Sequence, residues 1–167
     1  MKETLIRQRQ AWQTLSALLS ALPLLAWAAG SATVTVKVTV VAPPPCVIND
    51  DRPIEVEFGD VMTTRVDGDN YKMPVNYMLS CPGAPSNAMK LQVKGTGAAF
   101  DSTVLQSNKA DLGIELRQGD SKLAVNGWLN FTYPNKPELW AVPVKQRGAT
   151  LTGGEFSAGA TMEVAYQ

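Results

Sequence analysis

The chain has 167 residues, with 15 basic and 15 acidic side chains, two cysteines and no histidine. This length is enough for one domain with a hydrophobic core, and the balanced charge excludes the basic surface with which proteins bind nucleic acid. The absence of histidine removes the usual general base and the commonest metal ligand, so we expect neither an enzyme nor a metal or cofactor site.

Residues 1–28 have the pattern of a secretory signal peptide. A basic start at residues 2–9 precedes an apolar run of roughly 13 residues, which is too short to span a bilayer. Small residues favour cleavage after Ala28, with an alternative site after Ala32. Residues 1–28 hold three basic and one acidic side chains, so cleavage after Ala28 leaves a slightly acidic chain with 12 basic and 14 acidic side chains.

The segment that follows has the strongest strand pattern in the sequence. Valines at every second position alternate with polar residues: Val34, Val36, Val38 and Val40 with Thr35, Lys37 and Thr39 between them. This period of two in β-branched residues predicts a strand. Three prolines, Pro43 to Pro45, follow it and leave no tight turn, so the strand has no hairpin partner. Its partner must therefore lie elsewhere in its own sheet or in another chain.

The only two cysteines are Cys46 and Cys81, and both lie in the exported part of the chain. Two cysteines in an oxidising compartment are expected to pair, and the alternative is two buried free thiols. A disulfide that closes a loop of this length would stabilise the fold by roughly 3–4 kcal/mol on the chain-entropy model.

Alternating apolar residues predict a series of further short strands. They lie at Ile54–Phe58, Met73–Cys81, Met89–Val93, Leu112–Leu116, Leu123–Val125 and Val142–Val144. The Gly119-Asp120 pair predicts a hairpin between two of these strands. No helical periodicity follows residue 28, so seven or eight strands separated by turns predict an all-β antiparallel sandwich. Four aromatic residues are expected in its core rather than on a ligand platform: Trp128, Phe131, Tyr133 and Trp140.

The C-terminal run is also a predicted strand, and it continues to the end of the chain. Apolar residues occupy every second position from Phe156 to Tyr166. Gly154 stands fourteenth from the C-terminus, and Tyr166 is the penultimate residue. The exported chain thus begins and ends with a strand.

Together these features resemble the fimbrial subunits, or pilins, that the chaperone–usher pathway assembles. The resemblance is carried by the N-terminal alternating segment, Cys46 and Cys81, the DLGIEL run at Asp111–Leu116, Gly154 and Tyr166. It covers essentially the whole chain after the signal segment. Within the family, the chain is most like the minor subunits of P-pilus-type fimbriae.

The resemblance implies an incomplete immunoglobulin-like sandwich that lacks its last strand and carries an N-terminal donor-strand extension. The chain would comprise a signal peptide at 1–28, the extension at 29–42 and the pilin domain at 43–167. A periplasmic chaperone would first fill the groove beside the last strand, and an outer-membrane usher would then exchange it for the extension of a neighbouring subunit. The expected groove and chaperone contacts are Gly154, Ala160, Met162, Val164, Tyr166 and Gln167. The protein would pass through the periplasm to a fimbrium on the bacterial surface and support cell adhesion.

The extension departs from the family pattern in one respect, and this leaves its docking register open. Many pilin extensions carry a glycine near the middle, whereas residues 33–42 contain none. The sequence favours a minor or adaptor pilin. The alternatives are a major rod or terminator pilin, or a self-contained periplasmic β-sandwich that binds carbohydrate.

Overall fold

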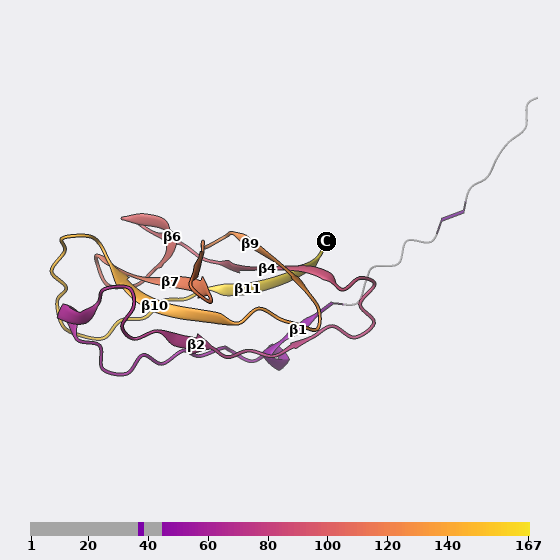
Figure 1. Ribbon diagram of the computed structural model, residues 1–167, viewed down its shortest axis with the longest axis horizontal. Coiled ribbons are helices and arrows are strands. Elements are labelled where there is room, and N and C mark those ends of the chain that lie inside the picture. Colours follow the sequence, from indigo (N-terminus) through magenta and orange to yellow (C-terminus); the bar gives the residue numbers. More distant parts are fainter. Residues whose placement is uncertain (1–36, 39–44) are drawn as a thin grey trace, which may run out of the picture. The chain divides into compact units, whose positions relative to one another are not determined.

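Residues 45–167 form a β-sandwich, which the computed structural model describes together with Lys37 and Val38 (Figure 1). The strands are β1 (Val47–Ile48), β2 (Met73–Val75), β3 (Leu79–Ser80), β4 (Ala88–Lys94), β5 (Gly97–Ala98), β6 (Asp101–Gln106), β7 (Leu112–Gln118), β8 (Ser121–Leu123), β9 (Trp128–Thr132), β10 (Leu139–Lys145) and β11 (Thr161–Tyr166). Two short 3-10 helices are η1 (Asn49–Asp51) and η2 (Thr63–Arg65). The predicted signal segment and most of the predicted extension lie outside the described residues. Within the part described, no helix has the length and apolar character needed to cross a membrane.

The larger sheet is antiparallel, with strand order β2-β10-β7-β6-β5, and β8 pairs with β7. Its centre is the pair β10 and β7, whose register runs without interruption from Leu139 opposite Gln118 to Lys145 opposite Leu112. Gln118 also pairs with Ser121, which confirms the hairpin predicted at Gly119-Asp120. A separate short pair joins β1 to β3.

The smaller sheet has the order β11-β4-β9, so β4 is paired on both sides and β11 lies at the edge. At the centre of β4, Leu91 stands opposite Val164 of β11 and Leu129 of β9. Leu91 and Met89 have no exposed surface, because alternate side chains of a strand point to the same face and this face packs on the core. The predicted all-β sandwich is confirmed.

Four predicted strands differ from those observed. The return strand predicted at Leu123–Val125 is β8, which ends at Leu123. The alternation of burial is as expected in Met73–Cys81 and Ile54–Phe58, but not from Phe156 to Tyr166, where Ala158 and Ala160 are exposed. Met73–Cys81 is divided into β2 and β3, with the residues between them unpaired. Ile54–Phe58 points alternate side chains inward but belongs to no strand pair among the described residues. The last strand begins at Thr161 rather than Phe156, because Thr161 stands opposite Lys94, the final residue of β4.

The predicted aromatic core is wrong for Trp128, Tyr133 and Trp140, whereas Phe131 packs against the hydrophobic core. Trp128 is 42% exposed, and Phe131, Tyr133 and Trp140 are only half-buried. On β9 the exposed positions alternate with half-buried ones, and Trp128 falls on the solvent face. There Lys90 of the neighbouring strand lies 4.6 Å from the centre of the Trp128 ring. The core is instead built mainly of aliphatic side chains from β4, β7 and β10.

Candidate functional site

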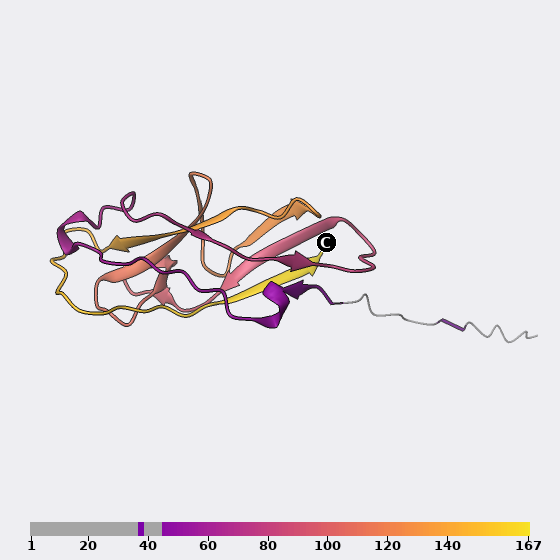
Figure 2. The ribbon, with the colours of Figure 1, turned by 90° about the horizontal axis from the view of Figure 1, so that it is seen from below.

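A groove runs between two segments that we call the first wall (residues 46–63) and the second wall (residues 151–162). It has an inner part of about 730 Å³ beside the start of β11 and an outer part of about 690 Å³ farther along the same walls. Figure 2 shows the second wall, leading into β11, on the same side of the domain as the first wall. The floor of the inner part consists of buried core residues: Val93, Leu105, Ile114, Leu116, Leu139 and Ala141. The groove therefore opens directly onto the hydrophobic core.

The first wall leaves the paired part of the domain through a left-handed turn. After β1, Asn49, Asp50 and Asp51 have φ angles of +52°, +53° and +58°, a region that Asn and Asp occupy more readily than other side chains. The Asn49 side-chain amide donates to the carbonyls of Arg52 and Pro53 at 3.1 and 2.9 Å and so closes the turn. Beyond it, the chain runs along the groove with Glu55 and Glu57 exposed and the apolar residues between and around them partly buried.

The second wall is anchored by the loop that precedes β7. The Lys109 ammonium donates to the Gly153 carbonyl at 2.6 Å. Asn108 and Ser157 form two reciprocal bonds, from the Asn108 N–H to the Ser157 carbonyl at 2.9 Å and from the Ser157 N–H to the Asn108 side-chain oxygen at 2.8 Å. Between these anchors, Gly154 has a φ of +115°, a backbone conformation that is sterically strained for any residue with a side chain. The wall is therefore fixed on both sides of residues 154–156.

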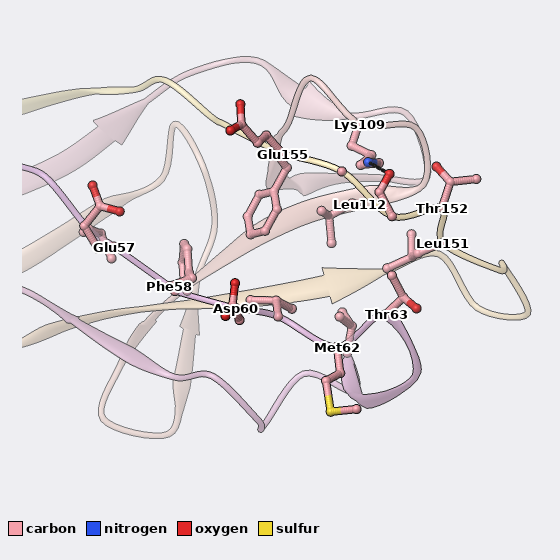
Figure 3. Close-up of a pocket in the computed structure, with 17 residues that line it drawn as sticks. Glu57, Phe58, Asp60, Met62, Thr63, Lys109, Leu112, Leu151, Thr152 and Glu155 are labelled. Atoms are coloured by element: carbon pink, nitrogen blue, oxygen red, sulfur yellow. Dashed lines mark hydrogen bonds between the residues drawn. The ribbon is translucent and has the colours of Figure 1, made fainter.

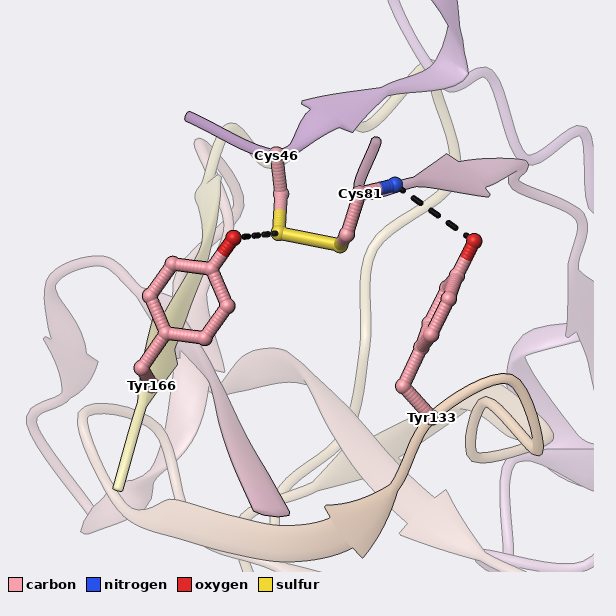
Figure 4. The surroundings of a disulfide bond; sticks show 4 residues. All are labelled: Cys46, Cys81, Tyr133 and Tyr166. Carbon is pink, nitrogen blue, oxygen red and sulfur yellow. Dashed lines mark hydrogen bonds between the residues drawn. A yellow bond between two sulfur atoms is a disulfide. The ribbon is translucent and has the colours of Figure 1, made fainter. Parts of the chain in front are cut away.

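The inner end of the groove is closed by a disulfide between Cys46 and Cys81, which confirms the predicted pairing (Figure 4). The Tyr166 hydroxyl at the end of β11 lies 3.8 Å from Cys46 Sγ and donates toward that sulfur. The hydroxyl of Tyr133 accepts a bond of 3.5 Å from the Cys81 N–H. The disulfide thus joins the beginning of the first wall to β3 and to the end of β11.

The groove residues expected from the sequence take different positions along this edge. Gly154 lines the outer part, and Ala160 and Met162 line the inner part. Val164 packs against the core. Gln167 is held to β4, because its backbone N–H donates to the Ala88 carbonyl at 3.1 Å and its side-chain amide donates to the Met89 carbonyl at 2.7 Å.

Of the four valines expected to act as a donor strand, only Val38 falls within the described residues, and its side chain is 76% exposed. Val34, Val36 and Val40 lie outside them.

The rim of the outer part is charged, whereas its floor is apolar (Figure 3). Glu57 and Asp60 come from the first wall, Glu155 comes from the second, and Lys109 stands near Gly153. No group of acidic, cysteine or histidine side chains within residues 45–167 could hold a metal ion. An apolar channel between two extended walls, one of which leads into the edge strand β11, is suited to an added β-strand, whose main chain pairs with the edge while alternate side chains fill the floor.

Sequence reasoning missed the first wall as part of the site, together with the anchors Asn108 and Lys109. The signal for the wall was present, because Ile54–Phe58 alternates but is followed by no hairpin turn that would supply a partner. Nothing in the sequence marks the anchors, because Asn108 lies 49 residues and Lys109 44 residues from the backbone groups that they bind.

The sequence matches one protein family and several known relatives. The profile of the fimbrial protein family matches residues 33–167. The chain is 42% identical over 136 residues to the uncharacterized fimbrial-like protein YfcR of Escherichia coli strain K12, covering 78% of each chain. It is 29% identical over 136 residues to the fimbrial adapter PapF of Escherichia coli, covering 74% of this chain and 81% of PapF.

Two solved structures resemble the domain. The P pilus adaptor subunit PapF has a TM-score of 0.58 at 26% identity, covering 75% of this chain and 98% of PapF. The P pilus rod subunit PapA has a TM-score of 0.58 at 23% identity, covering 82% of this chain and all of PapA, a likeness of fold alone.

Proposed function

The chain belongs to the fimbrial protein family, and we propose that it is a minor, adaptor-type structural subunit of a chaperone–usher fimbria on the bacterial surface. Its groove receives a strand from a periplasmic chaperone and later from a neighbouring subunit, and its own residues 29–42 are given to another subunit. The observation that carries this proposal is the groove between the two walls, whose floor is made of hydrophobic core residues that one more strand would cover.

The edge of β11 supports this role through its geometry. An added strand can hydrogen-bond to the edge of β11 while its alternate side chains cover the groove floor. Each valine buried in this way contributes about 1.5–3 kcal/mol before the cost of ordering the strand. The chaperone would contact Ala160 and Met162 and then the end of the chain at Tyr166 and Gln167.

The donor side of the proposal is tested with two substitutions at neighbouring positions. Val36→Asp places a carboxylate on the face that enters a neighbour's groove, and the cost should be several kcal/mol. Thr35→Asp is the matched control, because adjacent residues of a strand point to opposite faces. We expect strand exchange with a chaperone-bound partner subunit, followed on native gels, to fail for Val36→Asp and to continue for Thr35→Asp. Equal exchange by both variants would refute the assignment of faces.

The chaperone side is tested at the C-terminus. We expect Tyr166→Ser, combined with a short extension after Gln167, to reduce the amount of chaperone that co-purifies with the subunit. An undiminished complex would rule out this contact.

Loss of the Val36→Asp protein from the periplasm despite the chaperone would instead favour the alternative function, a self-contained β-sandwich with this strand in its own core.

A further inference from the structure

Acidic side chains stand on both sides of the outer part of the groove. On the first wall, Glu57 and Asp60 are exposed, whereas Phe58 between them packs against the core. On the second wall, Glu155 is exposed and precedes Phe156, which also packs against the core. Because neighbouring residues of an extended chain point to opposite sides, Glu57 and Glu155 stand at the mouth of the groove rather than on its floor. We call Glu57, Asp60 and Glu155 the acidic lips.

The two lips face each other across the groove. The ring centres of Phe58 and Phe156 are 5.9 Å apart. The residues that immediately precede them, Glu57 and Glu155, therefore lie on opposite walls at the same point along the groove (Figure 3). A strand laid over the floor at this point runs between a carboxylate on each side.

The acidic lips have no cation of their own. None of the three carboxylates forms an ion pair with a residue that the structure describes, whereas six other carboxylates do: Asp50, Asp69, Asp101, Glu115, Asp120 and Glu163. Lys109 is the one cation among the described residues that line the outer part, and its ammonium donates to the Gly153 carbonyl at 2.6 Å. The mouth of the outer part therefore carries an excess of negative charge that a partner can neutralise.

We propose that the acidic lips recognise a strand with a lysine or arginine on its outward face, and that the occupant is the extension of a neighbouring subunit with this property. The inference rests on the proposed function and adds the chemistry by which the strand is chosen. When the inward side chains of a strand cover the floor, the alternate side chains lie level with the lips and face solvent. A basic side chain there meets a carboxylate on either side, whereas an acidic one is repelled.

The extension of this chain has the required pattern and can serve as the probe. Lys37 is the only charged side chain among residues 29–42, and it alternates with the valines that are predicted to face inward. It is exposed and forms no ion pair with another described residue. Because a lysine side chain is long and flexible, its ammonium can reach the lips from more than one register of the strand.

The test measures exchange of synthetic peptides into the exported chain, purified as its complex with the periplasmic chaperone. One fluorescent peptide with blocked ends carries residues 29–44, in which Lys37 is the only charged side chain, and two others carry Lys37→Thr or Lys37→Glu. At ~20 mM salt we expect the unaltered peptide to enter fastest and Lys37→Glu slowest, with at least ~3-fold between them. At ~500 mM salt the difference should disappear, because salt screens exposed charges.

Substitutions in the lips should remove the preference. The double variant Glu57→Gln with Glu155→Gln is expected to take up the three peptides at nearly equal rates. Its matched control is Asp120→Asn with Glu138→Gln, which changes the net charge by the same amount at exposed residues outside the groove lining and should keep the preference. A Val36→Ala peptide is the control for the floor: it should enter more slowly at both salt concentrations, because it loses apolar contact and no charge.

The outcomes separate this inference from the proposed function. Equal uptake of the unaltered and Lys37→Glu peptides at low salt would overturn recognition by the lips, while strand acceptance would stand. A preference that survives in the Glu57→Gln with Glu155→Gln variant would overturn it as well. If no chaperone complex forms, or if no peptide displaces the chaperone, the acceptor function fails and the inference fails with it.

Discussion

β4 and the first wall have the same sequence pattern but differ in strand pairing and in burial. Met89–Val93 and Ile54–Phe58 both place apolar residues at every second position. β4 is paired on both sides and its inward residues are fully buried, whereas Ile54–Phe58 has no strand partner within residues 45–167 and its inward residues are half-buried. Alternation therefore tells which side chains face the core. Pairing also requires a neighbouring strand, and residues 45–167 supply none for this part of the first wall.

The largest effect should come from the paired region. We expect Leu91→Ala to lower the free energy of unfolding by about 3 kcal/mol or more, because it leaves a cavity at a site with no exposed surface. Val56→Ala, in the first wall, should cost less than about 1 kcal/mol in the free chain and more once a strand fills the groove. Urea unfolding of both variants, with and without a bound strand, measures the difference. Equal costs in the free chain would contradict the comparison.

Removal of the disulfide should have the next largest effect. Replacing Cys46 and Cys81 by serine frees a loop with a sequence separation of 35, at an expected cost of about 3 kcal/mol. The loss should concentrate at the inner end of the groove, because Tyr166 lies against Cys46. The check is urea unfolding together with chaperone binding; a variant that keeps full stability would show that the first wall needs no covalent anchor.

The smallest expected effect is the pH dependence of stability that comes from Tyr77, a buried residue of the hydrophobic core. Tyr77 donates to the Pro137 carbonyl at 2.7 Å, and burial raises the pKa of its hydroxyl to about 12. Its unfolded pKa is about 10, so the unfolded chain loses the proton first, and stability falls as pH rises from 10 to 12. We expect a decline on the order of 1 kcal/mol, because partial access of solvent weakens the effect. Tyr77→Phe should remove this part of the decline; an identical pH dependence in both proteins would refute it.

The sequence could predict the features that depend on residues close together in the chain. It could not predict contacts between residues far apart in the chain. Alternation placed the inward residues of β4 and β7, and Gly119-Asp120 predicted the hairpin between β7 and β8. The hairpin of β5 and β6 was not predicted, because apolar residues do not alternate clearly with polar ones in Gly97–Gln106.

The site was predictable in part. Ala160 and Met162 line the inner part of the groove, and their contact with a chaperone stays a prediction. The contact between Phe58 and Phe156 could not be foreseen, because the two residues lie in segments far apart in the chain and each reads locally as one more apolar residue of a strand. The exposed aromatic residue Trp128 was misplaced for a related reason, since its face is decided by the register of β9 on β4.

Hydrogen–deuterium exchange tests the central claim most directly, because it reports pairing at each backbone amide. In the free mature chain, the amides of Ile54–Phe58 and of residues 158–160 should exchange quickly, whereas those of β4 should be protected. When a neighbouring subunit's extension peptide occupies the groove, we expect exchange along the second wall and the edge of β11 to slow by at least ~10-fold, while β4 changes little. Protection of both walls in the free chain, or no change when the strand binds, would contradict the account.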